Sequence, residues 1–96
     1  MKNYEELLEK AKEWREWYYD GDPGTPEVAK STEEAFNLIN ATLFGHIYQR
    51  PKLDAKIRSL CTIAALIVLD KPNQLPGHIT GALNYGWSKE EIVELI

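Results

Sequence analysis

The feature that most constrains this chain is an apolar run from Leu60 to Leu69, which only Thr62 interrupts. The run is about half as long as the roughly 20 residues that a membrane-spanning helix needs, so we expect no membrane partner. It continues a segment without glycine or proline, and it predicts a helix over residues 55–69 whose second half is apolar on every side. A 96-residue chain has little surface with which to cover such a helix. We therefore expect a homo-oligomer with this helix at its centre.

Four further helices are predicted from apolar residues at helical spacing, and no segment shows the alternation of a strand. The first runs from Tyr4 to about Tyr19 and ends at a cluster of turn residues over 20–26. The second is expected to begin at Ser31, which forms a capping-box pattern with Glu34.

The later helices have clear end signals. Pro51 ends the second helical region, because the residue before a proline is pushed away from helical geometry. Asp54 is the expected N-cap of the third helix. A fourth helix is expected from Gln74 or Leu75 to Tyr85, where Gly86 ends it. A fifth is expected from the Ser88–Glu91 capping box to Ile96. The sequence thus predicts one all-α domain over 1–96, with an N-terminal helix and turn at 1–26 and a core at 31–96.

The composition, with 44% hydrophobic and 27% charged residues, places the chain in the soluble globular class. A net charge of −4 argues against a nucleic-acid partner. The N-terminus lacks the apolar stretch of a signal peptide, so we expect a cytoplasmic protein. Residues 46–58 differ from the rest of the chain in charge, because they contain four basic residues and one acid. The stretch is either a solvated surface or a patch that attracts a small anionic molecule. The basic residues are Arg50, Lys52, Lys56 and Arg58, and the acid is Asp54.

The single cysteine, Cys61, limits the redox chemistry of the chain. It excludes an intrachain disulfide, a C-x-x-C pair and a cysteine-rich zinc site, and we expect no metal. Because Cys61 lies in the apolar run, we expect a buried, poorly reactive thiol with no role in turnover.

His78 is the strongest candidate for chemistry. Gly77 and Gly81 flank it within a predicted helix, where each glycine costs about 1 kcal/mol relative to alanine, so they indicate close approach by a ligand or by another helix. A histidine of near-neutral pKa suits proton transfer. His46 either interacts with a helix C-terminus or joins the basic patch. Arg58 either pairs with an acid, such as Glu34 or Asp54, or holds a substrate carboxylate. The aromatic group Trp14, Trp17, Tyr18 and Tyr19 is expected to serve packing.

Residues 44–96 carry a series of motifs in a specific order. These are Phe44-Gly45-His46 through Asp54, Arg58-Ser59-Leu60, Gln74-Leu75-Pro76-Gly77-His78, Gly81 through Gly86, and Ser88 through Ile92. The pattern resembles the carboxymuconolactone decarboxylase family of the alkylhydroperoxidase D-like superfamily. The resemblance implies an all-α fold that assembles into ring-like trimers or hexamers. It also implies that the chain lacks the C-terminal helix of the decarboxylase branch. Lys71 and Gln74 match the two cysteines of the redox branch, and Ser59 matches its glutamate.

The resemblance and the residues together suggest three functions. The first is a decarboxylase, without metal or organic cofactor, that acts on a small anionic lactone or related acid. In it His78 moves the proton, while Arg50, Arg58 and His46 bind the carboxylate. The second is an alkylhydroperoxidase or peroxiredoxin-type antioxidant activity that uses Cys61 as a lone thiol. The third is a non-enzymatic oligomeric binding protein.

Overall fold

The computed structural model describes residues 3–21 and 32–96, and every regular element in them is helical. The elements in chain order are α1 (Tyr4–Tyr18), α3 (Glu33–Leu43), the 3-10 turn η1 (Ile47–Gln49), α4 (Ala55–Val68), α5 (Leu75–Asn84) and α6 (Lys89–Leu95). The predicted all-α class is confirmed for these residues. None of the described helices is long and apolar enough to cross a bilayer.

Short polar side chains start most of the helices. The Asp54 side chain accepts a hydrogen bond from the Lys56 amide at 3.0 Å, as predicted. The predicted capping box between Ser88 and Glu91 is complete, with both of its hydrogen bonds formed. The start of α3 differs from the prediction, because Thr32 occupies its N-cap position. Ser31 itself lies outside the described residues.

The crossing of α1 and α3 depends on a glycine. Gly45 follows α3, and a Cβ atom added there would lie 2.2 Å from the Leu7 carbonyl oxygen and 2.5 Å from that of Ala41. Both contacts are with backbone atoms, and the one with Leu7 lies across the crossing, so only glycine allows the two helices to approach this closely. The helix ends at Leu43, earlier than the Pro51 signal suggested, and η1 carries the chain onward. This crossing places His46 beside the start of α1.

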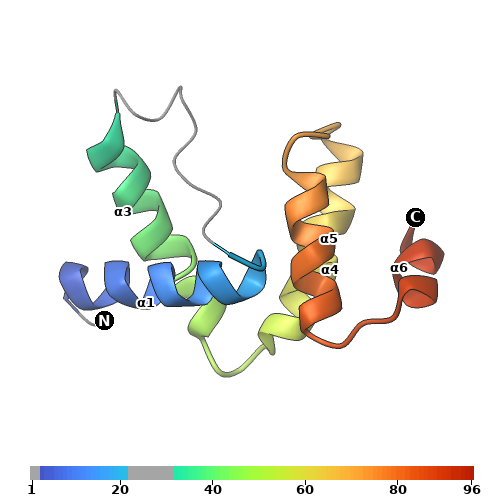
Figure 1. Ribbon diagram of the computed structural model, residues 1–96, viewed down its shortest axis with the longest axis horizontal. Coiled ribbons are helices and arrows are strands. Elements are labelled where there is room, and N and C mark those ends of the chain that lie inside the picture. Colours follow the sequence, from blue (N-terminus) through green and yellow to red (C-terminus); the bar gives the residue numbers. More distant parts are fainter. Residues whose placement is uncertain (1–2, 22–31) are drawn as a thin grey trace.

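Helices α4 and α5 lie side by side, with α6 at the end of the chain (Figure 1). Their aliphatic core consists of Ile63, Ala82 and Ile92, against which Ile67, Leu75, Ile79 and Trp87 pack. The last helical residue of α4 is Val68, one residue short of the prediction. The chain turns there through Asp70, whose φ of 54° is left-handed.

One face of α4 remains open. Ser59 and Ile63 are fully buried, whereas Ile57 is 44% exposed and Val68 is 84% exposed. Cys61 lies on the exposed side, so the prediction of a buried thiol is wrong for this chain. The reason is that α5 and α6 cover the opposite side of α4 from the one that carries Cys61. Across the described residues, nine hydrophobic side chains are buried and twelve large ones are exposed.

Candidate functional site

His78 lies in the first turn of α5, and its ring is held between two tyrosines, the last residue of α1 and the C-cap that follows it. Its Nδ1 atom lies 2.9 Å from the Tyr18 hydroxyl, and its Nε2 atom lies 3.4 Å from the Tyr19 hydroxyl. Both phenol rings meet the imidazole edge to face, at centroid distances of 5.4 and 5.8 Å. Only 9% of His78 is exposed, and Tyr18 is fully buried. Tyr19 is half-buried, so it is the member of the trio that solvent reaches.

The glycines beside His78 admit these tyrosines. A Cβ atom added at Gly81 would lie 2.0 Å from the Tyr18 ring, and one added at Gly77 would lie 2.8 Å from Cε1 of Tyr19. Of the two explanations offered for the glycines, approach by another helix is the one that the structure confirms. The helix that approaches is α1, and the contact brings its two phenol groups to the imidazole.

Burial sets the protonation states of the trio. It lowers the pKa of His78 to about 4, so the imidazole is neutral at pH 7. Burial also raises the pKa of Tyr18, and it raises that of Tyr19 to about 12 even though the nearby Arg15 charge acts in the opposite direction. A neutral imidazole has one donor and one acceptor nitrogen. With the proton on Nε2, Tyr18 donates to Nδ1, the ring donates to Tyr19, and the Tyr19 hydrogen is left for a ligand.

The rest of the aromatic group fixes the two tyrosines. Trp14 stacks on Tyr18 at a centroid distance of 4.3 Å and donates its indole N–H to the Tyr85 hydroxyl at 2.8 Å. The Asn84 side-chain amide donates to the Trp17 carbonyl at 2.9 Å and to the Tyr18 carbonyl at 3.1 Å, which ties the end of α5 to the end of α1. The packing role predicted for these aromatic residues is confirmed for Trp14 and Tyr18. The additional role of Tyr18 and Tyr19 as partners of His78 was not predicted.

His46 and Arg50 lie together at a different place. They line a hollow of about 500 Å³ together with Lys10 of α1. The other residues that line it are Leu7, Gly45, Gln49 and Pro51. The structure therefore joins two of the predicted anion-binding residues in one basic hollow, but His78 is not part of its lining.

The remaining predicted site residues lie on α4. Arg58 donates its Nε hydrogen to the Leu53 carbonyl at 3.2 Å. Arg58 is not part of the lining of the basic hollow. Cys61 is on the open face of the same helix. In the described parts of the chain, no group of three or more histidine, cysteine or acidic residues is placed to hold a metal ion.

Residues 33–96 match the sequence model of the carboxymuconolactone decarboxylase family. The chain belongs to this family. The match begins at α3, eleven residues before the motifs that first suggested the resemblance. His46, Arg50, Arg58, Cys61 and His78 all lie within the residues matched to the carboxymuconolactone decarboxylase family. Helix α1 precedes them, so both phenol partners of His78 come from outside the match.

Two curated relatives are similar to the chain. The 4-carboxymuconolactone decarboxylase of Acinetobacter baylyi is 38% identical over 60 residues, which are 62% of this chain and 45% of the relative. The nitrosuccinic acid decarboxylase of Metarhizium robertsii is 37% identical over 65 residues, which are 68% of this chain and 46% of the relative. The chain spans about half the length of the curated relatives it matches. No solved structure gives a significant match.

Proposed function

We propose that this chain is a decarboxylase-like enzyme that needs no cofactor and acts on a small anionic acid, with His78 as its proton-transfer residue. The observation that carries the proposal is the neutral imidazole of His78 between two phenol hydroxyls, on a helix inside the family match. The names of both relatives support it, since each describes the loss of carbon dioxide from a small acid.

The chemistry requires a proton donor next to the substrate. When the bond between the carboxyl group and the neighbouring carbon breaks, carbon dioxide leaves and the electron pair stays on that carbon. A lactone carbonyl or a nitro group delocalises the pair, and a proton must then be delivered to carbon. In the proposed step the Tyr19 hydroxyl gives this proton. The Nε2 hydrogen of His78 replaces it while Tyr18 gives its own hydrogen to Nδ1. A solvent proton that enters at Tyr19 then drives the reverse shift, which returns Tyr19, His78 and Tyr18 to their starting states.

In the proposal, His46 and Arg50 attract the anionic substrate at the basic hollow, away from His78. Arg50 and Lys10 place two positive charges in one hollow of a chain whose net charge is −4, and His46 adds a hydrogen-bonding ring. Such a local field raises the concentration of an acidic substrate near the surface. We therefore expect His46→Gln and Arg50→Gln to raise KM at low salt and to leave kcat unchanged. Arg58, with its Nε bonded to the Leu53 carbonyl just before α4, is left out of this pair.

The proposal is tested by measuring release of carbon dioxide from 4-carboxymuconolactone and from nitrosuccinic acid. His78→Gln should lower kcat by about 10²–10⁴. Tyr85→Phe is the matched control, because Tyr85 belongs to the same aromatic group but bonds to Trp14 and not to His78. The proposal fails if wild-type protein releases no carbon dioxide from either acid, or if His78→Gln is as active as wild type. Acid binding without turnover would instead support the binding-protein function.

We also propose that the chain assembles with copies of itself, as a trimer or hexamer, through the open face of α4. The support is the excess of exposed over buried large apolar side chains and the exposure of Ile57 and Val68 on one helix. Val68→Glu should dissociate the assembly, whereas Lys12→Glu on α1 should not. Sedimentation velocity at micromolar concentration measures both, and a wild-type monomer would contradict the proposal. Ile67 is a poorer test site because it packs against the aliphatic core.

A further inference from the structure

We infer that Arg15 of α1 is the residue that binds a carboxylate of the acid beside His78. The inference rests on the proposed function, and it names a binding residue that the sequence did not single out. The candidates taken from the sequence, Arg50 and Arg58, lie in the basic hollow and on α4. Arg15 instead neighbours Tyr19, the residue through which the proposed proton leaves.

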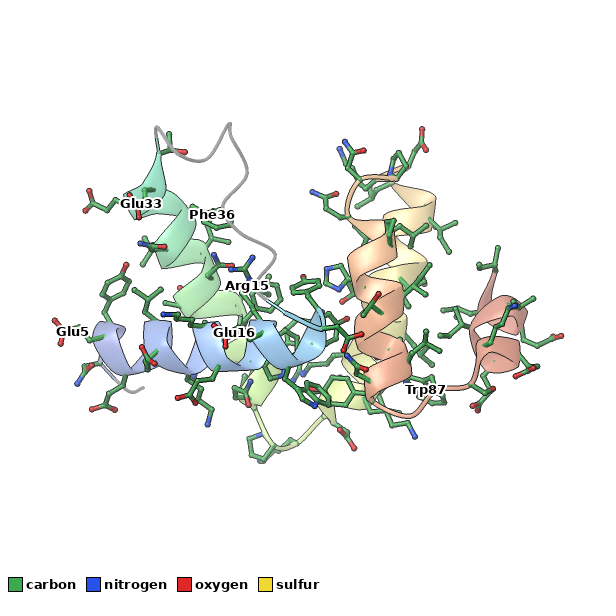
Figure 2. The ribbon with its side chains drawn as sticks, in the orientation of Figure 1. Glu5, Arg15, Glu16, Glu33, Phe36 and Trp87 are labelled. Atoms are coloured by element: carbon green, nitrogen blue, oxygen red, sulfur yellow. The ribbon has the colours of Figure 1, made fainter. Side chains whose placement is uncertain are left out.

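The side chain of Arg15 lies where α1 meets α3. Its guanidinium carbon is 5.9 Å from the centre of the Tyr19 ring, 5.6 Å from that of Phe36 and 5.9 Å from that of Phe44. Figure 2 shows Arg15 next to Phe36, in the angle between the two helices. The same Tyr19 places its hydroxyl 3.4 Å from His78 Nε2. Tyr19 therefore joins the guanidinium and the imidazole in one continuous group.

The Nε atom of Arg15 is an unpaired donor. It is buried and has no hydrogen-bond partner among the described residues. Leaving a buried donor unpaired destabilises the fold, and does so more for a charged group, so an unpaired donor of this kind calls for an explanation. The aromatic rings interact with the cation but accept no strong hydrogen bond from it. A carboxylate suits the donor, because it accepts two parallel bonds from the guanidinium fork.

The positions around Arg15 on its own helix leave it without an acid. Salt bridges along a helix form between residues three or four apart, and at those distances Arg15 has Ala11, Lys12, Tyr18 and Tyr19. Lys10 differs, because it has Glu6 and Glu13 at those spacings and shares a surface hollow with both. In this acidic helix, Arg15 is thus a cation whose local partners are aromatic.

The two side chains at this place are only partly covered. Arg15 and Tyr19 are both half-buried, so part of each side chain remains in contact with solvent. An acid held by the guanidinium would lie over the Tyr19 hydroxyl, with His78 behind it. The carboxylate that Arg15 holds is the one the acid retains, because an ion pair to the departing group would stabilise the ground state. The substrate class is accordingly a small acid with at least two anionic groups.

Succinate is a suitable probe, because it carries two carboxylates and does not lose carbon dioxide. We expect its addition to shift the NMR signals of the His78 and Tyr19 rings, and Arg15→Gln to weaken its binding about tenfold or more. Arg15→Lys should bind with intermediate affinity, since it keeps the charge but loses the fork. Lys12→Gln is the matched control, because it removes one positive charge from the same helix and should leave the affinity unchanged.

Two outcomes would overturn the inference. One is a wild-type protein whose His78 and Tyr19 signals do not respond to succinate. The other is an unchanged affinity in Arg15→Gln, or in Arg15→Lys if the glutamine variant does not fold. The proposed function fails separately: succinate binding that depends on Arg15, in a protein that releases no carbon dioxide, would retain the binding site and remove the reaction. Turnover that depends on His78 but not on Arg15 would keep the proposed reaction and remove Arg15 as the binding residue.

Discussion

Helices α1 and α3 meet over an aromatic core, whereas α4, α5 and α6 meet over an aliphatic one. The first core is built from Ala11, Phe44 and Tyr48, with Trp14 packed against it. The second consists of Ile63, Ala82 and Ile92, with three aliphatic neighbours and Trp87 packed against it. Aliphatic packing depends on area and shape and has no preferred direction. The aromatic side carries hydroxyl, indole and imidazole groups that must each find a partner when buried.

This difference explains why the candidate site lies on the aromatic side. The indole of Trp14 donates to Tyr85, the Tyr48 hydroxyl bonds to Thr62, and the Tyr18 hydroxyl lies against His78. Each of these contacts fixes an orientation as well as a distance. A site for proton transfer needs such directional contacts, and the aliphatic side provides a rigid support for them through α5.

The largest loss of stability is expected from a substitution at the crossing of α1 and α3, on the aromatic side. Gly45→Ala places a methyl group against two backbone carbonyls, so we expect a loss of about 3 kcal/mol or more in the free energy of unfolding. Gly77→Ala is the control, because its new methyl group meets the edge of the Tyr19 ring, which can turn away. Urea denaturation measures both. If Gly45→Ala is as stable as wild type, the two helices do not cross as closely as described.

A slightly smaller effect is expected from pH. The folded chain binds a proton at His78 only near pH 4, whereas the unfolded chain binds it near pH 6.5. The unfolded state therefore holds more protons between these values, and stability should fall as pH decreases from 6.5 to 4, by about 3 kcal/mol, and change no further from this group below 4. His78→Gln provides the baseline, because it removes only this group. If the free energy of unfolding depends on pH in the same way in wild type and in His78→Gln, His78 is not buried.

The smallest effect is expected on the aliphatic side. Ser88→Ala removes the capping box of α6 and should cost about 1 kcal/mol. Hydrogen exchange should become faster in α6, while the NMR signals of the His78 ring remain in place. A change at His78 would show that the two cores are coupled, and the comparison between them would no longer hold.

Much of the fold could be predicted because its signals are local. The Asp54 cap and the Ser88 capping box depend on residues within one turn, and both are confirmed. The early end of α3 at Leu43 is different, because the Gly45 that soon follows it packs against a helix far away in the sequence, and such a contact leaves no local signal. The exposure of Cys61 escaped prediction for the same reason. An apolar run does not reveal which of its faces the rest of the chain covers.

The candidate site was predictable in part. Gly77 and Gly81 correctly indicated that something approaches His78 closely. They could not indicate Tyr18 and Tyr19, because these lie about 60 residues away and look like ordinary packing residues. Arg15 gave no signal either, since an arginine in a charged helix is unremarkable until its buried neighbours are known.

The stack of Trp14 on Tyr18 also gives the molecule an optical property. Two aromatic rings 4.3 Å apart and 17° from parallel, fixed in an asymmetric setting, produce circular dichroism in the near ultraviolet that vanishes when tight packing is lost. The other half of the molecule holds Trp87, whose ring lies 4.6 Å from the Lys56 ammonium group. Each half therefore contains its own chromophore. Replacing one tryptophan at a time by phenylalanine would let the melting of the two halves be followed separately by light alone.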